Sequence, residues 1–540
     1  MQAVPGAVPL VLGVVPGAAI TMKTTMAVEA GKQVEDTLAP GLRGGAGGGG
    51  GAGGGGGMGG GPQAGPDAGA PPPMDEVDDP DQPQPGDLVE NDFVDAEEDA
   101  LSTFSVDVDT ASYTATRAQL RREALPIPTS VRIEEFINFF RYDYPSPRPD
   151  DAHPFSVHME AGPSPFGEGK QMMKIGIKGM EIAPEDRDPA NLVFLIDVSG
   201  SMSTPNKLGL VQHSLKLLTN SLQHDDTLSI VTYAGRNTVL LEPTRVEDRG
   251  IIFEAIDGLT SGGGTNGAGG LREAYALAEQ AYVEGGINRV VLCTDGDFNV
   301  GLTGEPLIRE VESWRDRGVY MTVLGYGYQF NDSFLEDLTN RADGNYAFVD
   351  SRNEALRVLG ERLVSTLQVI AKDVKIQVEF NPLRVERFRL VGYENRVLDH
   401  QDFRDDTVDA GEIGSGHFVT ALYEIELAET EEGEPEPGPN ETLAEVRFRY
   451  KTPEGDPDRP GIEFSTFMQL GALQAAVDDL SEDFRFVLAV AEFAEILRRS
   501  QHSEGDLFDE VIGLATREDE PLGDRIEFIQ LVRRAQSIWR

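Results

Sequence analysis

The middle of the chain alternates between continuous apolar runs and amphipathic helical patterns. The run NLVFLID opens this series, and LSIVTYA, RVVLCTD and YMTVLGYG continue it, with apolar positions of helical period between them. A short strand is expected at 239–241, and a long helix at 353–370 closes the series. Continuous β-branched runs are typical of parallel strands that are covered by helices on both faces. The pattern therefore predicts an α/β domain with a doubly wound, Rossmann-like parallel sheet over residues 191–370.

The N-terminal flank of this domain, residues 101–190, has a mixed pattern. VRIEEFINFFRYDY has helical spacing and predicts a helix at 131–144, which ends before a proline. Two strand-like runs follow at 154–161 and 172–182, the second with clear alternation. This flank is therefore expected to be an α+β region.

The C-terminal flank, residues 371–540, is β-rich first and helical afterwards. DVKIQVEF, RFRLVGY, HFVTALYEIEL and AEVRFRY alternate with a period of two, and helical patterns begin at 482. Alternation is typical of antiparallel strands with one solvated face. Neither flank has enough strands for a stable layer of its own, so we expect the two flanks to share a sheet or sandwich.

Residues 1–100 have neither pattern. An almost pure glycine run at 44–61 is followed by prolines at 71–73 and by an acidic stretch at 75–99. Such a composition cannot offset its ordering entropy by burial and predicts a disordered tail. The first residues, MQAVPGAVPLVLGVVPGAAITMK, are apolar but lack the positive region of a secretory signal, so a degenerate signal and a plain tail both stay open. We favour the cell envelope over the cytoplasm as the location, and leave both open.

Charge and cysteine usage exclude several classes of function. The 540 residues include 92 acidic and 46 basic side chains, a formal net charge of −46, which repels phosphate backbones and argues against nucleic-acid binding. The single cysteine, Cys293, excludes a disulfide framework and cysteine-rich metal sites, and its place in VVLCTD predicts a buried strand residue. No apolar run approaches the roughly 18 residues of a membrane span, so no transmembrane segment is predicted.

The strongest chemical signal follows the first strand of the central domain. There the chain reads DVSGSM, with Asp197, Ser199 and Ser201, while a glycine-rich loop carries Thr265 and the strand RVVLCTD ends at Asp295. Ligands of open α/β sheets bind outside the carboxyl ends of the strands, so these three loops are expected to meet. Carboxylate and hydroxyl oxygens are ligands that suit Mg²⁺ or Mn²⁺. Two carboxylates would neutralise the ion and leave a position open for an anionic group of a partner.

In this βα context the five residues resemble the metal-ion-dependent adhesion site of von Willebrand factor type A (vWA) domains. The likeness extends further: STFSVDVDTASY, VRIEEFINFF, TDGDFNVG, AKDVKIQVEFNP and DAGEIGSGHFVTALYEI are similar to bacterial YfbK-like type A domain proteins. The resemblance implies a Mg²⁺-dependent protein-binding domain rather than an enzyme. The expected partner is a protein that supplies a Glu or Asp carboxylate to the ion.

Two alternatives from other classes stay open. Asp107 and Asp109 in SVDVDTAS are similar to the paired aspartates of Mg²⁺-dependent phosphohydrolases, although Ala111 replaces the usual Thr or Val, and we prefer a structural role for the pair. The other alternative is an intracellular assembly or chaperone-like module.

A dinucleotide-binding loop is a weaker match. Gly262, Gly264 and Gly267 satisfy GxGxxG, but that motif needs a strand directly before it. Here a helical pattern precedes the glycines, so we expect them to shape the loop that carries Thr265.

Overall fold

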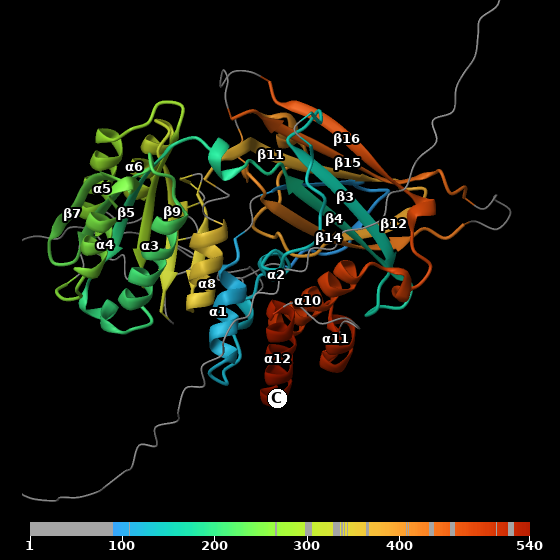
Figure 1. Cartoon of the computed structure of the whole chain (residues 1–540). Helices are drawn as coiled ribbons and strands as arrows, with labels where there is room; N and C mark the ends of the chain where they lie inside the picture. The colour runs from blue at the N-terminus through green and yellow to red at the C-terminus, as the bar shows by residue number, and fades with distance from the viewer. Residues whose placement is uncertain are drawn as a thin grey trace, which may run out of the picture. The chain divides into compact units, whose positions relative to one another are not determined.

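The computed structural model describes residues 90–539 of the chain, with short gaps. Within this range the description omits residues 107–108, 149, 265–266, 297–304, 328–334, 336–337, 340, 343, 363–366, 407, 409, 431–436, 454–459, 504 and 517–522. Figure 1 shows the helices and strands of the described part.

The central α/β domain is built on a six-stranded sheet in the order β10–β9–β8–β5–β6–β7, green to yellow in Figure 1. In that order the strands are Tyr346–Val349, Tyr320–Tyr326, Ile287–Thr294, Ala190–Asp197, Thr227–Tyr233 and Asn237–Arg245. Neighbouring strands are parallel except β6 and β7, which are antiparallel. The expectation of an all-parallel sheet is therefore wrong at this edge. Only three residues separate β6 from β7, too few for the crossover that parallel strands need.

Helices cover both faces of this sheet. On one face, α3 (Leu208–Ser221), α4 (Arg249–Asp257) and α8 (Arg352–Ala355) share a core with alternate residues of β5. On the other, α5 (Gly267–Gln280) and α6 (Glu305–Arg315) form a core with the remaining β5 side chains. Every residue of β5 is buried, which explains its uninterrupted apolar sequence. The doubly wound arrangement predicted from the sequence is confirmed.

The last predicted helix of the domain is shorter than expected. The chain runs through α8 and a π-helix at Leu356–Arg362, and strand β11 already begins at Val369. The prediction of a helix to residue 370 is wrong at its end, because 369–380 form a strand that pairs with three other strands along its length. Pairing in a sheet outweighs the helical spacing of the preceding residues.

The two flanking regions form one sheet together. The N-terminal flank contributes β3 (Phe155–Pro163) and β4 (Lys170–Gly179), the C-terminal flank contributes β12 (Val385–Leu390) and β14 (Phe418–Leu427), and the segment before residue 101 adds the short edge strand β1 (Val94–Asp95). The strand order is β1–β12–β14–β4–β3, so β4 and β14 join the flanks at the centre of the sheet. This confirms the expectation that the flanks share a sheet.

A second sheet completes the β-rich region. It runs in the order β13–β11–β15–β16, with β2 paired to β11, and these strands are Ile413–Gly414, Val369–Phe380, Thr442–Lys451, Ile462–Gln469 and Leu101–Ser105. Side chains of both sheets belong to a single buried apolar cluster. Phe380 stacks on Phe388 with 4.2 Å between ring centroids, and Phe155 packs on Phe448 at 5.8 Å. The region is therefore a β-sandwich.

Helices from both flanks pack together on the outer face of the first sheet, where their core includes Met172 and Leu422. They are α1 (Ala111–Leu120), α2 (Ile133–Ile137), α10 (Glu482–Arg498), α11 (Phe508–Ala515) and α12 (Gly523–Ile538). The C-terminal helices predicted from the sequence are confirmed.

The helix predicted at 131–144 is reduced to α2, which ends at Ile137. Asn138 explains the early end. Its amide Nδ2 donates to the Glu134 carbonyl at 2.9 Å, and its Oδ1 accepts the backbone N–H of Thr420 at 2.7 Å. Asn138 thus anchors the end of α2 to β14, and the aromatic residues after it reach the core from a turn and an irregular segment instead of a helix.

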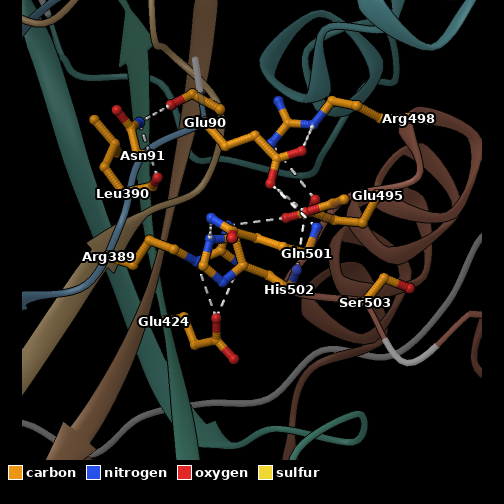
Figure 2. Close-up of polar contacts among 12 residues, drawn as sticks. Glu90, Asn91, Arg389, Leu390, Glu424, Glu495, Arg498, Gln501, His502 and Ser503 are labelled. Atoms are coloured by element: carbon orange, nitrogen blue, oxygen red, sulfur yellow. Dashed lines mark hydrogen bonds and ion pairs between the residues drawn. The ribbon is translucent and has the colours of Figure 1, made fainter. Parts of the chain in front are cut away.

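Ordered structure begins before residue 101. Asn91 donates to the Leu390 carbonyl at 3.0 Å, and the Glu90 carboxylate accepts the Ser500 hydroxyl at 2.8 Å, as Figure 2 shows in part. The predicted tail boundary at residue 100 is therefore wrong for 90–100. Their acidic sequence indicated solvation, but Asn91 has hydrogen-bond partners on and next to β12, and Glu90 has one after α10.

Candidate metal centre

Asp197 is the last residue of β5 and is fully buried. Its Oδ1 accepts the backbone N–H of Ser199 at 2.7 Å, and the Ser199 hydroxyl lies 2.8 Å from the Ser201 hydroxyl. The other carboxylate oxygen, Oδ2, is buried and, within the described part of the chain, accepts no hydrogen bond of good geometry. Ser201 is exposed. The loop therefore leads from the buried Asp197 carboxylate to a hydroxyl that faces the solvent.

Asp295 directly follows β8, the parallel neighbour of β5. Its side chain is almost fully buried, and its Oδ2 lies 2.8 Å from the Lys207 ammonium. Its Oδ1 is buried and has no hydrogen-bond partner among the residues that the structure describes. Because adjacent parallel strands end at the same edge, Asp197 and Asp295 are brought together as the sequence predicts.

The environment of Asp197 disfavours its negative charge. Burial is the main cause that raises its pKa to about 6; the Ser199 backbone hydrogen bond opposes this rise, and the nearby Asp295 charge contributes to it. Two carboxylates that are close together and shielded from water need a positive group to remain ionised.

Thr265 lies outside the described residues, but the glycine loop before it contacts the Asp197 loop directly. Gly262 donates to the Val198 carbonyl at 2.7 Å, and the Gly263 carbonyl accepts the Gly200 N–H at 3.2 Å. Gly263 has φ +94°, which favours glycine. The loop follows helix α4 and not a strand, so the context of a dinucleotide-binding loop is missing, as expected.

The donor set fits a small hard cation. Buried, unpartnered carboxylate oxygens are costly, and a divalent ion would compensate them. Serine hydroxyls and water complete the coordination that Mg²⁺ prefers. Within the described residues no group of three or more Asp, Glu, His or Cys side chains is placed to hold a metal, so a site here relies on hydroxyls as well as carboxylates.

Asp109, from the alternative phosphohydrolase motif, has a structural environment. Its Oδ1 accepts the backbone N–H of Tyr346 at 2.8 Å, and its Oδ2 lies 3.6 Å from the Arg396 guanidinium. The side chain is buried and ties the segment before α1 to β10. Asp107 lies outside the described residues.

Lys207 is the functional candidate that sequence reasoning missed. It directly precedes α3 and lies ten positions after Asp197, a spacing that predicts no contact between the two side chains. The ion pair between the Lys207 ammonium and the Asp295 carboxylate is visible only in the folded structure.

Comparison with known proteins assigns the family. Residues 365–538 match the family "Uncharacterized protein YfbK, C-terminal", residues 191–362 match "von Willebrand factor type A domain", and residues 82–174 match "von Willebrand factor". The uncharacterized protein YfbK of Escherichia coli (strain K12) is 36% identical over 461 residues, which cover 81% of this chain and 78% of that protein. The chain belongs to the YfbK family. This confirms the resemblance and the predicted combination of a type A domain with flanking regions.

Other relatives of this YfbK-family chain share a smaller region. The magnesium-chelatase 67 kDa subunit of Chlorobaculum parvum is 33% identical over 121 residues, 22% of this chain and 19% of that protein. Among solved structures, the von Willebrand factor type A protein from Catenulispora acidiphila is 16% identical, has a TM-score of 0.39, and covers 72% of this chain and 91% of its own.

All five predicted ligands fall within the type A region of the YfbK-family chain. Type A domains mediate protein interactions, and many bind a divalent metal ion. In the described part of the chain, no helix has the length and apolar character required to cross a membrane.

Proposed function

We propose that this protein binds a protein partner through a divalent cation, Mg²⁺ or Mn²⁺, at the carboxyl edge of the central sheet. Asp197, Ser199, Ser201, Thr265 and Asp295 would hold the ion, which when bound offers a Lewis-acidic position to an oxygen of the partner. One observation carries the proposal: Asp197 Oδ2 and Asp295 Oδ1 are buried at the ends of adjacent strands and accept no hydrogen bond of good geometry from the described residues.

A Glu or Asp side chain is the proposed group of the partner. The charge of a bound cation dominates its immediate surroundings, so it attracts one more anionic oxygen. The net charge of −46 repels an acidic partner at long range. Salt screens that repulsion beyond about 8 Å at physiological ionic strength but does not screen a direct bond to the metal. Binding should therefore need the metal and should persist or strengthen in moderate salt.

We propose binding rather than an enzymatic reaction. Asp109 is engaged by the Tyr346 backbone and by Arg396, which leaves it poorly suited to attack a phosphate. The Ser199 and Ser201 hydroxyls lie within hydrogen-bonding distance of each other, and their sequence lacks the elbow of a hydrolase nucleophile.

Isothermal calorimetry with Mg²⁺ tests the site. The Asp197→Ala variant should lose binding, whereas Asp257→Ala, which removes an exposed aspartate paired with Lys216 on the same domain, should bind like the wild type. Capture of partner proteins in Mg²⁺ and in EDTA then tests the function. Equal Mg²⁺ affinity in wild type and Asp197→Ala, or partner binding that is unchanged by EDTA, would show that the proposal is wrong.

A further inference from the structure

Lys207 lies at the edge of the candidate metal centre, although it is not one of the five proposed ligands. Its Nζ is 2.8 Å from Asp295 Oδ2, and the lysine side chain is only 19% exposed, against 2% for Asp295. A partly desolvated ammonium at this distance is a strong electrostatic partner for the carboxylate.

A second feature supports this placement. Gly327, directly after β9, has φ +109°, and a Cβ built at this position would lie 2.6 Å from Lys207 Cε. The absence of a side chain at Gly327 therefore leaves the room through which Lys207 reaches Asp295. Three separate parts of the domain meet here: Asp295 follows β8, Lys207 precedes α3, and Gly327 follows β9.

We propose that Lys207 sets both the metal affinity of the centre and its preference for an anionic partner group. This inference rests on the proposed function. Lys207 and the cation are attracted by the same Asp295 carboxylate and repel each other, so Lys207 lowers the affinity for the metal. Asp197 and Asp295 together neutralise a divalent ion. The lysine ammonium is then the group that leaves the loaded centre positive, and it strengthens the attraction for a carboxylate.

The two effects have opposite signs. Replacement of Lys207 by Met keeps the length of the apolar stem and removes the charge, so the metal should bind more tightly, by about tenfold, a typical size for a change in the groups around metal ligands. A carboxylate should then bind more weakly to the loaded centre, also by about tenfold, because the positive charge that attracts it from a few ångströms away is gone. A merely structural role of Lys207 would weaken both steps together.

The experiment uses the full chain with Mn²⁺ as the metal and acetate as the carboxylate probe. Free Mn²⁺ is measured by its electron paramagnetic resonance signal, and acetate binding is measured by the fall in water-proton relaxation as acetate replaces water on bound Mn²⁺. Lys216→Met is the matched control, because Lys216 lies on α3 and its ammonium pairs with the exposed Asp257. It should behave like the wild type, and Lys207→Arg should recover much of the acetate affinity.

Each result decides a different point. If the wild type binds no Mn²⁺, the proposed function and this inference are both wrong. If the wild type binds Mn²⁺ but Lys207→Met has the same Mn²⁺ affinity, or binds acetate as well as the wild type does, only the inference is overturned. Tighter Mn²⁺ with weaker acetate in Lys207→Met, and not in Lys216→Met, supports it.

Discussion

Asp188 and Gln368 hydrogen-bond to each other twice: the Asp188 N–H donates to Gln368 Oε1 at 3.0 Å, and Gln368 Nε2 donates to Asp188 Oδ2 at 2.8 Å. The first residue directly precedes the central α/β domain and the second directly follows it, so the chain leaves the β-sandwich and returns to it at one point. The sandwich itself is built from strands on both sides of this insertion. The type A domain is therefore inserted into the sandwich.

Removal of the inserted domain should leave the sandwich folded. We expect a chain in which a short glycine–serine linker replaces residues 189–367 to unfold cooperatively in urea, because β3, β4, β12 and β14 remain in one sheet. The isolated segment 369–540 should not do so, since it lacks the central strand β4. Circular dichroism and urea titration check both, and cooperative unfolding of 369–540 alone would contradict the shared sheet.

Residues 90–100 should matter for stability, in contrast to the preceding residues. A chain that begins at residue 90 should unfold at the same urea concentration as the full chain. One that begins at residue 101 should be less stable by about 2–3 kcal/mol, because it loses the partly buried hydrogen bonds of Asn91 and the Glu90 contacts in Figure 2. Equal midpoints for the two shortened chains would show that this segment contributes nothing.

The sequence predicts those parts of the fold that follow from a local hydrophobic pattern or from the shared carboxyl edge of parallel strands. β5 is recognisable because both its faces are buried, and Asp197 and Asp295 meet because adjacent parallel strands end at one edge. Cys293 is buried in β8 as predicted, and burial raises the pKa of its thiol to about 12. The contact between Lys207 and Asp295 was not predictable, because it depends on the space beside Gly327, far away in the sequence.

Glu492 should make the protein less stable as the pH rises. Burial is the main cause that raises its pKa from 4.5 to about 7, and the Glu495 and Glu424 charges add to it, against a hydrogen bond from Ser503. The folded chain therefore holds this proton where the unfolded chain has lost it. The stability from Glu492 is fully present below pH 4.5 and is lost between pH 4.5 and 7.

The variant Glu492→Gln tests this sign. It should lie within about 1 kcal/mol of the wild type at pH 5 and exceed its free energy of unfolding at pH 8 by about 3.5 kcal/mol at most, because the pKa is raised from 4.5 to about 7 and each pKa unit represents about 1.4 kcal/mol. Glu510→Gln, at an exposed position on α11, should show no such difference. Urea unfolding at the two pH values measures both variants. A smaller advantage at pH 8 than at pH 5 would contradict the raised pKa.

Thermal unfolding in EDTA and in Mg²⁺ should separate the charge of Asp197 from its proposed metal binding. In EDTA at pH 8, Asp197→Asn should be at least as stable as the wild type, because a neutral amide replaces a buried carboxylate beside Asp295. The wild type should gain about 2.7 kcal/mol when free Mg²⁺ reaches one hundred times its dissociation constant, since the ion binds only the folded chain. Asp197→Asn should gain almost nothing.

The control variant Asp257→Asn should gain as much as the wild type does, because the Asp257 carboxylate pairs with Lys216 on the surface. Equal stabilisation of all three chains by Mg²⁺ would mean that the ion binds elsewhere, and a strong loss of stability in EDTA for Asp197→Asn would mean that the carboxylate is needed for folding and not for the ion.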